Sequence, residues 1–276
     1  MKHSLKIILI LVMLFLVTQY FGLFIIDSYS TETIQNINGE NITNTTWSAL
    51  PFNIERPTVQ QETSSIALLI SIFLITFLIL LIIKYNLEIV WKTWFFTSVL
   101  FCLLIAFGSF LTAQLSFILA SVLSYAKIFK RNIITQNISE LFIYGGLASI
   151  FVPVMNILSV SIFLILISIY DYIAVFKTKH MIKMAKSQAK LKIFPGILIP
   201  YKKNKAAILG GGDLGLPLIF TGVALKTLGN TAYIIPIFST LALYCLMAIG
   251  KKNKFYPAMP FLSIGCFAGY LFALLL

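Results

Sequence analysis

Charged residues are scarce in this sequence. Only 11% of its 276 residues are Asp, Glu, Lys or Arg, whereas 59% are hydrophobic and the mean hydropathy is +0.95. An ordinary soluble domain has about 25% charged and about 45–50% apolar residues. So few polar side chains could not cover a surface that faces water. The composition excludes a soluble enzyme or transcription factor and predicts a polytopic membrane protein.

Cysteine and histidine are scarce too, with three of the first and two of the second. Cys102, Cys245 and Cys266 fall inside apolar runs and share no motif spacing, so we interpret them as small apolar residues rather than a disulfide or metal set. His3 and His180 lie in basic flanks and make no metal site with a nearby cysteine. We therefore expect no metal and no other cofactor.

Long apolar runs occupy most of the chain, and a membrane helix needs roughly 20 such residues. Gly108 and Ser109 divide the longest run, over 88–128, and a weaker run contains Pro153. The sequence therefore predicts an all-α polytopic membrane protein with nine transmembrane helices. They would span residues 6–26, 65–83, 89–107, 110–127, 138–154, 156–176, 206–226, 230–249 and 257–276.

Basic residues outnumber acidic ones by 21 to nine and give the chain a net charge of +12. If the N-terminus is cytoplasmic, nine spans place 19 of the basic residues inside, and only Arg56 and Lys226 fall outside. This distribution follows the positive-inside rule and predicts a C-terminus on the outside. The segment over 177–205, rich in lysine, would be a cytoplasmic loop.

We expect the chain to form a single membrane domain over residues 1–276. Residues 1–155 would supply the first five helices, with an outside loop over 27–64, and residues 156–276 the last four. The first apolar run is longer than the hydrophobic region of a typical signal peptide, and no A-x-A-like site follows it. We therefore expect this run to be a retained anchor.

Two of the nine acidic residues, Asp171 and Asp213, lie inside apolar runs. A carboxyl group at membrane depth costs several kcal/mol unless it is neutral, paired or hydrated, so it is a functional hypothesis by default. Asp171 precedes Lys177 by six residues and Asp213 follows Lys205 by eight. Helical rise then places both acids roughly 9–12 Å from the cytoplasmic helix ends. Because consecutive helices are often neighbours, we expect the two carboxyls to face each other.

Two carboxyl groups that share a site do not easily ionise together, so the pair holds one proton between them. In an aspartic protease, one carboxylate takes a proton from the attacking water while its partner donates one to the peptide carbonyl. The same acids could carry protons in a transporter or an ion-leak pathway, or form a structural hydrogen-bonded pair. Depth alone leaves these three interpretations open.

A run of glycines stands directly before Asp213. A protease that cuts a transmembrane helix must unwind it first, because i→i−4 hydrogen bonds hold the helical carbonyls. Glycines lower helical stability, let another backbone come close and leave main-chain groups free to pair with an extended substrate. Small residues also serve ordinary helix packing. The run consists of Gly210, Gly211 and Gly212.

Two further features lie near the acids. Tyr170 precedes Asp171, and its hydroxyl could hydrogen-bond near the pair, although a membrane tyrosine more often packs or lies at the interface. Two prolines at the start of the last span prevent a regular helix there and fix a bent segment, yet proline is also common at ordinary helix N-termini. That segment consists of Pro257, Ala258, Met259 and Pro260.

These motifs together resemble those of the presenilin and signal-peptide-peptidase family of intramembrane aspartic proteases. That family carries Tyr-Asp on its sixth helix, Gly-x-Gly-Asp on its seventh and Pro-Ala-Leu at its ninth. Tyr170-Asp171, Gly210–Asp213 and Pro257–Met259 lie on the corresponding predicted helices. Met259 departs from the usual leucine, which is a mild change of volume. The resemblance covers the topology of the whole chain, and its sequence over about 156–262.

The resemblance implies an intramembrane aspartic endopeptidase of the Gly-x-Gly-Asp type, with Asp171 and Asp213 as its dyad, one water and no metal. Tyr170, the glycine run and Pro257–Pro260 would support the site. Substrates would be transmembrane proteins or peptides in a lipid membrane, with no nucleic acid and no obligatory protein partner. The small size resembles archaeal members, and we expect a single unprocessed chain. A proton-coupled transporter or ion-leak pathway using the same acids is the alternative.

Overall fold

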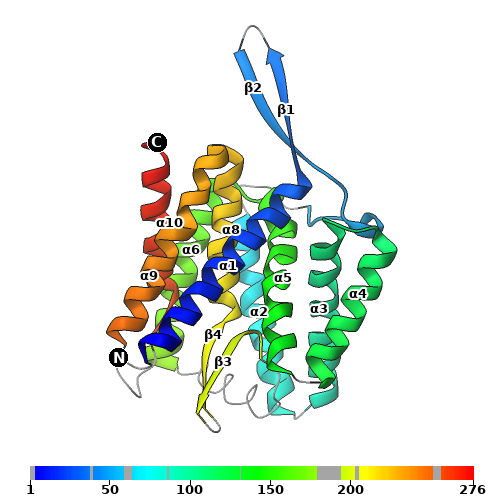
Figure 1. Ribbon diagram of the computed structural model, residues 1–276, viewed down its shortest axis with the longest axis vertical. Coiled ribbons are helices and arrows are strands. Elements are labelled where there is room, and N and C mark those ends of the chain that lie inside the picture. The colour runs from blue at the N-terminus through cyan, green and yellow to red at the C-terminus, as the bar shows by residue number, and fades with distance from the viewer. Residues whose placement is uncertain are drawn as a thin grey trace.

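The computed structural model describes residues 4–37, 40–58, 64–85, 87–130, 132–178, 194–202, 205–250 and 256–276. Its helices form one bundle with a two-stranded hairpin at each end (Figure 1). The α-helices are α1 (Leu5–Tyr29), α2 (Ser64–Lys84), α3 (Glu88–Gly108), α4 (Ala113–Tyr125), α5 (Ile133–Phe151), α6 (Ile157–Ile173), α8 (Gly211–Leu228), α9 (Ile235–Ile249) and α10 (Met259–Ala273). The strands are β1 (Ser30–Ile37), β2 (Glu40–Trp47), β3 (Gly196–Lys202) and β4 (Lys205–Gly210).

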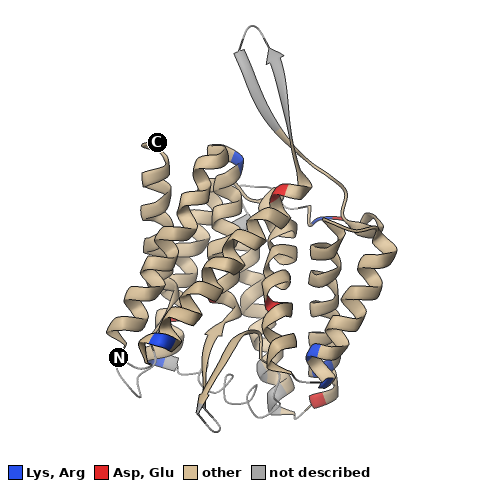
Figure 2. Cartoon of the chain, viewed as in Figure 1, with Lys and Arg blue, Asp and Glu red and all other residues tan. Residues whose placement is uncertain are grey.

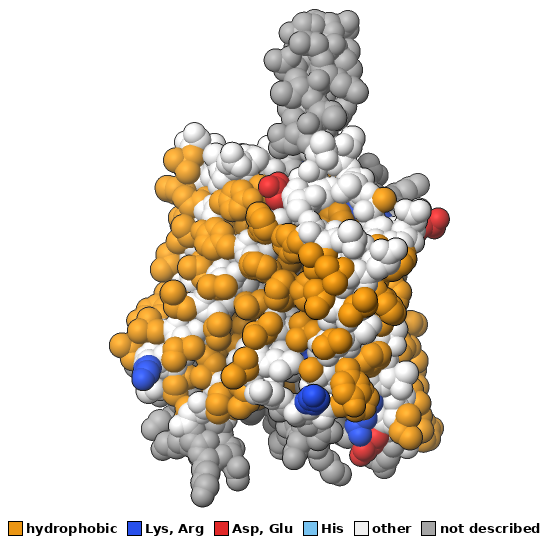
Figure 3. Space-filling view, turned by 45° about the vertical axis from the view of Figure 1, so that its right-hand side comes forward, with side chains coloured by type: hydrophobic (Ala, Val, Ile, Leu, Met, Phe, Trp, Pro, Cys, Tyr) orange, Lys and Arg blue, Asp and Glu red, His pale blue; other side chains and the backbone are white. Residues whose placement is uncertain are grey.

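The chain is an integral, multi-pass membrane protein. Within the described ranges, five helical segments are long and apolar enough to cross a membrane, while the apolar helices over Ile66–Ile79 and Met259–Ala273 are shorter. The number of nine crossings therefore stays a prediction. Apolar side chains cover the face in Figure 3 between its two ends. Such a surface suits contact with lipid, because the helices satisfy the hydrogen-bonding groups of their own backbone. The five segments are Leu5–Tyr29, Glu88–Gly108, Ile133–Val154, Ile157–Lys177 and Gly211–Ile249.

Two hairpins correct the expectation of an all-α chain, which is right for most of the described residues. The segment over 27–64, expected to be a loop, contains the antiparallel pair β1 and β2. The pair β3 and β4 occupies residues 196–210. The first hairpin is rich in threonine and isoleucine, which favour strands. Most of the basic segment predicted over 177–205 lies outside the described residues.

The second hairpin changes how Asp213 is positioned. The helix predicted over 206–226 begins as β4, and α8 starts at Gly211 because the backbone of Gly210 is extended, with φ −69° and ψ 152°. Asp213 therefore lies in the first turn of α8. The predicted depth of Asp213 was wrong, because it counted helical rise from Lys205 and residues 205–210 form a strand.

Basic side chains of the described residues gather at the bundle end that carries β3 and β4 (Figure 2). The two predicted exceptions both contact carbonyls at the other end of α5 or in the turn that follows it. Arg56 Nε donates to the carbonyl of Ser149 at 3.4 Å, and Lys226 Nζ donates to those of Val152 and Met155 at 3.1 and 2.7 Å. The last carbonyls of a helix lack intrahelical donors and carry the negative end of its dipole. These cations therefore stabilise the end of α5.

Lys226→Met is expected to lower the free energy of unfolding by about 1–3 kcal/mol, because two part-buried carbonyl groups lose a charged donor. Denaturant unfolding in detergent measures this loss. Lys92→Met is the matched control, since Lys92 Nζ lies 3.7 Å from Glu88 Oε2 in a partly exposed pair. Such a pair contributes about 0–1 kcal/mol, so equal losses in the two variants would contradict the capping role of Lys226.

Candidate active site

Helices α6, α8 and α10 pack against one another and bring the sequence motifs to one place. Asp171 lies in the last turn of α6, Asp213 in the first turn of α8, and α10 begins at Met259. The hydroxyls of Ser168 and Ser263, 2.8 Å apart, join α6 to α10 close to Asp171. This serine contact was not predicted from the sequence, because it depends on which helix faces meet.

Asp171 is buried and holds the start of α10. Its Oδ2 accepts a hydrogen bond from the Met259 amide at 3.2 Å, and the Ala258 amide lies near the same carboxyl. The first amides of a helix lack intrahelical acceptors and carry the positive end of its dipole. Pro257 and Pro260 have no amide hydrogen, so the amides available to Asp171 at this helix start belong to Ala258 and Met259.

Asp213 completes the pair from α8. Its carboxyl lies beside Gly210 and close enough to Asp171 for the two groups to interact electrostatically. A Cβ atom at Gly210 would lie 3.2 Å from Asp213 Oδ2, whereas one at Gly212 would meet nothing within 4 Å. The structure thus brings the two predicted acids, the glycine run and Pro257–Pro260 together, with open space beside Gly212.

Tyr170 contacts a different helix. Its ring packs edge-on against Phe73 of α2, with ring centroids 5.2 Å apart and an interplanar angle of 86°. This contact helps to hold α2 against α6. The predicted hydrogen bond of the Tyr170 hydroxyl near the acids stays a prediction.

A cavity of about 320 Å³ lies beside the glycine run, between α3, α5 and α8. Gly211, Gly212 and Gly215 form its α8 wall, and Glu140 and Tyr144 lie on its α5 wall. Most of the other lining side chains are apolar, so the cavity suits an apolar segment with a few polar contacts.

Strand β4 leads directly into the glycine run. The Gly211 amide donates to the carbonyl of Pro195 at 3.1 Å and closes the base of the hairpin. Among the described strands, β4 pairs only with β3. An extended peptide can add to such a strand edge through main-chain hydrogen bonds.

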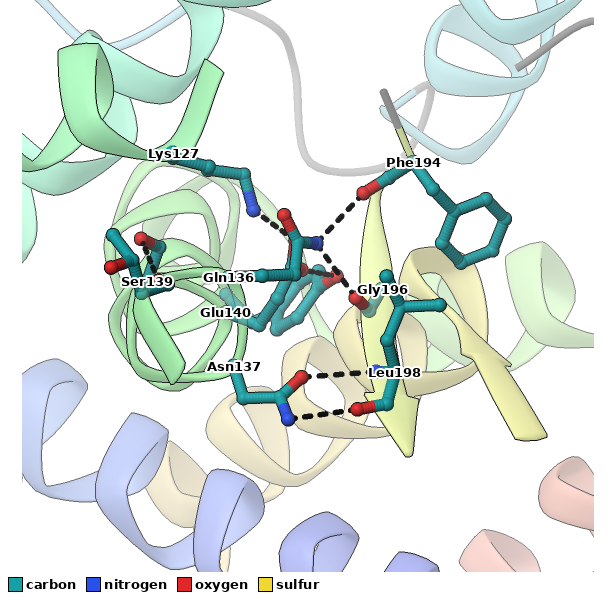
Figure 4. A network of polar contacts seen from close by, with 10 residues as sticks. Lys127, Gln136, Asn137, Ser139, Glu140, Phe194, Gly196 and Leu198 are labelled. Carbon is teal, nitrogen blue, oxygen red and sulfur yellow. Dashed lines mark hydrogen bonds and ion pairs between the residues drawn. The ribbon is translucent and has the colours of Figure 1, made fainter. Parts of the chain in front are cut away.

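A buried cluster on the α5 side of the cavity was not predicted as part of the site. Lys127, which follows α4, forms an ion pair with Glu140, and the Tyr144 hydroxyl donates to the same carboxylate. Figure 4 shows Lys127 and Glu140 facing each other beside β3. The available signal was the spacing of four between Glu140 and Tyr144, which places both on one helix face.

No group of three or more His, Cys, Asp and Glu in the described parts of the chain could hold a metal ion. Cys102, Cys245 and Cys266 are free. His3 and His180 lie outside the described residues. The expected absence of a metal or other cofactor stays a prediction.

Met259→Ala is expected to lower the free energy of unfolding by about 2–5 kcal/mol, because this buried side chain would leave a cavity. Met259→Leu is the matched control with an expected cost below about 1.5 kcal/mol, since it conserves volume. Both variants keep the amide that reaches Asp171. Unfolding in detergent measures the difference, and equal stability of the two variants would contradict the packing role of Met259.

Residues 42–276 match a family model described as signal-peptide peptidase, presenilin aspartyl protease. The fold is similar to that of a presenilin family intramembrane aspartate protease solved in the C222 space group, with a TM-score of 0.66 and 19% identity over 97% of this chain and 98% of that chain. A structure of such a protease in the P2 space group gives a TM-score of 0.65 and 18% identity over 96% of each chain. No curated protein matches this chain significantly.

Proposed function

This chain belongs to the signal-peptide peptidase and presenilin family of aspartyl proteases, and we propose that Asp171 and Asp213 are the carboxyl groups with which it cuts peptide bonds inside the membrane. One observation carries this assignment. Helices α6, α8 and α10 pack against one another and bring the two acids to one place, next to the glycine run that precedes Asp213.

In the proposed reaction, the two carboxyls share one proton and hold a water between them. The carboxylate takes a proton from this water as its oxygen bonds to the peptide carbonyl carbon, and the protonated partner gives its proton to the carbonyl oxygen. The C–N bond of the tetrahedral intermediate then breaks. One carboxyl returns a proton to the amine nitrogen while the other takes one from a hydroxyl, which restores the starting dyad.

The proposed substrates are transmembrane segments of proteins or peptides. A helical segment must be unwound, because its carbonyls are otherwise held in hydrogen bonds. The edge of β4 that pairs with no other described strand could bind the unwound stretch, and the open space beside Gly212 would let its backbone approach Asp213. The apolar cavity next to Gly212 would take side chains of the same segment.

The supporting residues have separate proposed roles. The Met259 amide orients Asp171, because it is fixed at the start of α10. Tyr170 supports the same helix turn through its contact with α2. Gly210 leaves room for the Asp213 carboxyl.

We also propose a single membrane domain over 1–276, in which residues 1–155 carry the supporting helices and 156–276 the catalytic ones. The described basic side chains gather at the end with β3 and β4 (Figure 2), and the positive-inside rule places that end in the cytoplasm. The start of α1 and the end of α10 lie at opposite ends of the bundle (Figure 1), which supports a cytoplasmic N-terminus and an outside C-terminus.

Purified protein in liposomes with a transmembrane peptide tests the proposed function. The expected result is cleavage inside the apolar stretch of the peptide. Neither the family nor the fold favours the transport alternative, which predicts proton flux into sealed vesicles without cleavage. Flux with several intact peptides and a folded protein would contradict the protease assignment.

A further inference from the structure

One face of α5 carries a row of polar side chains that the proposed reaction does not use. Gln136, Glu140 and Tyr144 follow each other at intervals of four residues, so they lie along one stripe of the helix, and Asn137 lies next to it. Figure 4 shows Gln136, Asn137 and Glu140 directed toward β3. We call these four residues, together with Lys127, the α5 stripe.

Glu140 is the centre of the α5 stripe and is only 1% exposed. Its carboxylate forms an ion pair with the buried Lys127, accepts the Tyr144 hydroxyl hydrogen and accepts Gln136 Nε2 at 2.9 Å. A buried ion pair is weak evidence for stability, because apolar residues of similar volume often serve as well or better. The groups that Glu140 orients are therefore a better guide to its role than its contribution to stability.

The lower part of the α5 stripe holds β3. Gln136 Nε2 donates to the carbonyls of Phe194 at 2.8 Å and Gly196 at 2.9 Å. The Asn137 side chain accepts from the Leu198 amide and donates to its carbonyl, both at 2.9 Å. The side-chain amide of Asn137 thus pairs with the backbone N–H and C=O of Leu198 in β3, as the backbone of a neighbouring strand would.

The upper part of the α5 stripe contacts the start of α8. A Cβ atom at Gly211 would lie 2.7 Å from Tyr144 Oη, and one at Gly215 would lie 3.4 Å from Tyr144 Cδ1. Gly211 also donates its amide hydrogen to Pro195 and stands two residues before Asp213. The same stripe therefore contacts both ends of the hairpin that leads into the glycine run.

We propose that the α5 stripe is a positioning platform, in which Glu140 aligns Gln136, Tyr144 and Lys127. These side chains would fix the position of β3, β4 and the first turn of α8 along the bundle axis relative to Asp171. The proposal rests on the proposed proteolytic function. If the hairpin sets where an unwound substrate lies, the platform determines which peptide bond reaches the dyad. Lys127, Gln136 and Asn137 act as positioning residues outside the lining of the cavity, whereas Glu140 and Tyr144 also lie on its wall.

Tyr144→Phe and Asn137→Ala test the platform at its two ends. Tyr144→Phe keeps the ring and removes only the hydroxyl that binds Glu140, while Asn137→Ala removes both bonds to Leu198. Ser139→Ala is the matched control, because this buried hydroxyl on the same helix donates only to the carbonyl of Thr135. Mass spectrometry of the peptide products gives the distribution of cleavage positions, and steady-state kinetics gives kcat and KM.

The expected result is a broader distribution of cleavage positions in both variants and a fall in kcat of roughly tenfold. This is the size of one lost hydrogen bond to a charged group in Tyr144→Phe, and of two lost bonds between neutral groups in Asn137→Ala. Ser139→Ala should give the wild-type positions and kcat. A purely structural role would reduce the amount of folded enzyme but leave the cleavage positions unchanged, so unchanged positions in both variants would overturn the platform alone. Absence of cleavage by the wild type would instead overturn the proposed function on which the platform rests.

Discussion

Asp171→Asn and Asp213→Asn are each expected to abolish cleavage, with a loss of about a thousandfold or more, the upper range for a general acid or base. An amide cannot take the proton from water or carry the shared proton. The change keeps the shape of the side chain, and the asparagine oxygen at position 171 can still accept the Met259 amide hydrogen. The fold should therefore survive in both variants.

Purified variants are compared with the wild type on one transmembrane peptide, with unfolding in detergent as the check on the fold. Asp27→Asn is the matched control, because Asp27 is an exposed carboxylate near the end of α1 that contacts Ser30. It should cleave like the wild type. Near-wild-type turnover by either Asp171→Asn or Asp213→Asn would show that the dyad is wrongly assigned.

Gly212→Leu is expected to reduce cleavage by about a hundredfold while leaving stability close to that of the wild type. A Cβ atom at Gly212 meets nothing within 4 Å, so the fold has room for a side chain there. The same room is the proposed approach of the substrate backbone to Asp213, and a displacement of about 1 Å at a reacting centre can cost about a hundredfold in rate. The variant therefore separates access from folding.

Gly22→Ala is the control variant, for which we expect the opposite combination of effects on cleavage and stability. A Cβ atom at Gly22 of α1 would lie 2.3 Å from Leu218 Cδ2 on α8, far too close without a shift of that side chain. This variant should lower stability yet keep the wild-type cleavage positions. If Gly212→Leu cleaves as fast as the wild type, the substrate does not approach through the space beside Gly212.

The two acids could be predicted from the sequence because a carboxyl inside an apolar run is expensive and rare. Spans such as α1 and α6 could be predicted because a bilayer requires long apolar runs. Strand β4 could not, since Ala206-Ala207-Ile208-Leu209 is as apolar as the helix that follows it. Only pairing with β3 and the extended backbone of Gly210 distinguish the two.

Contacts between distant elements were beyond the reach of sequence patterns. The α5 stripe joins Lys127, Glu140 and the carbonyl of Phe194, which are far apart in the sequence. Lys226 fell outside the positive-inside pattern, and its bonds to the end of α5 explain why a cation is stable there. The alternation of charge along the sequence could identify Lys226 as an exception, but it could not predict which carbonyls accept its hydrogen bonds.

The most direct test of the central claim is hydrolysis of a transmembrane peptide in water enriched in oxygen-18. We expect products cut inside the apolar stretch, with one oxygen-18 atom in the new carboxyl terminus and no products from Asp171→Asn or Asp213→Asn. This result would establish hydrolysis within the apolar stretch that depends on both acids. Products without the label would show that they did not arise by hydrolysis in the assay, and an intact peptide with folded wild-type protein would contradict the protease itself.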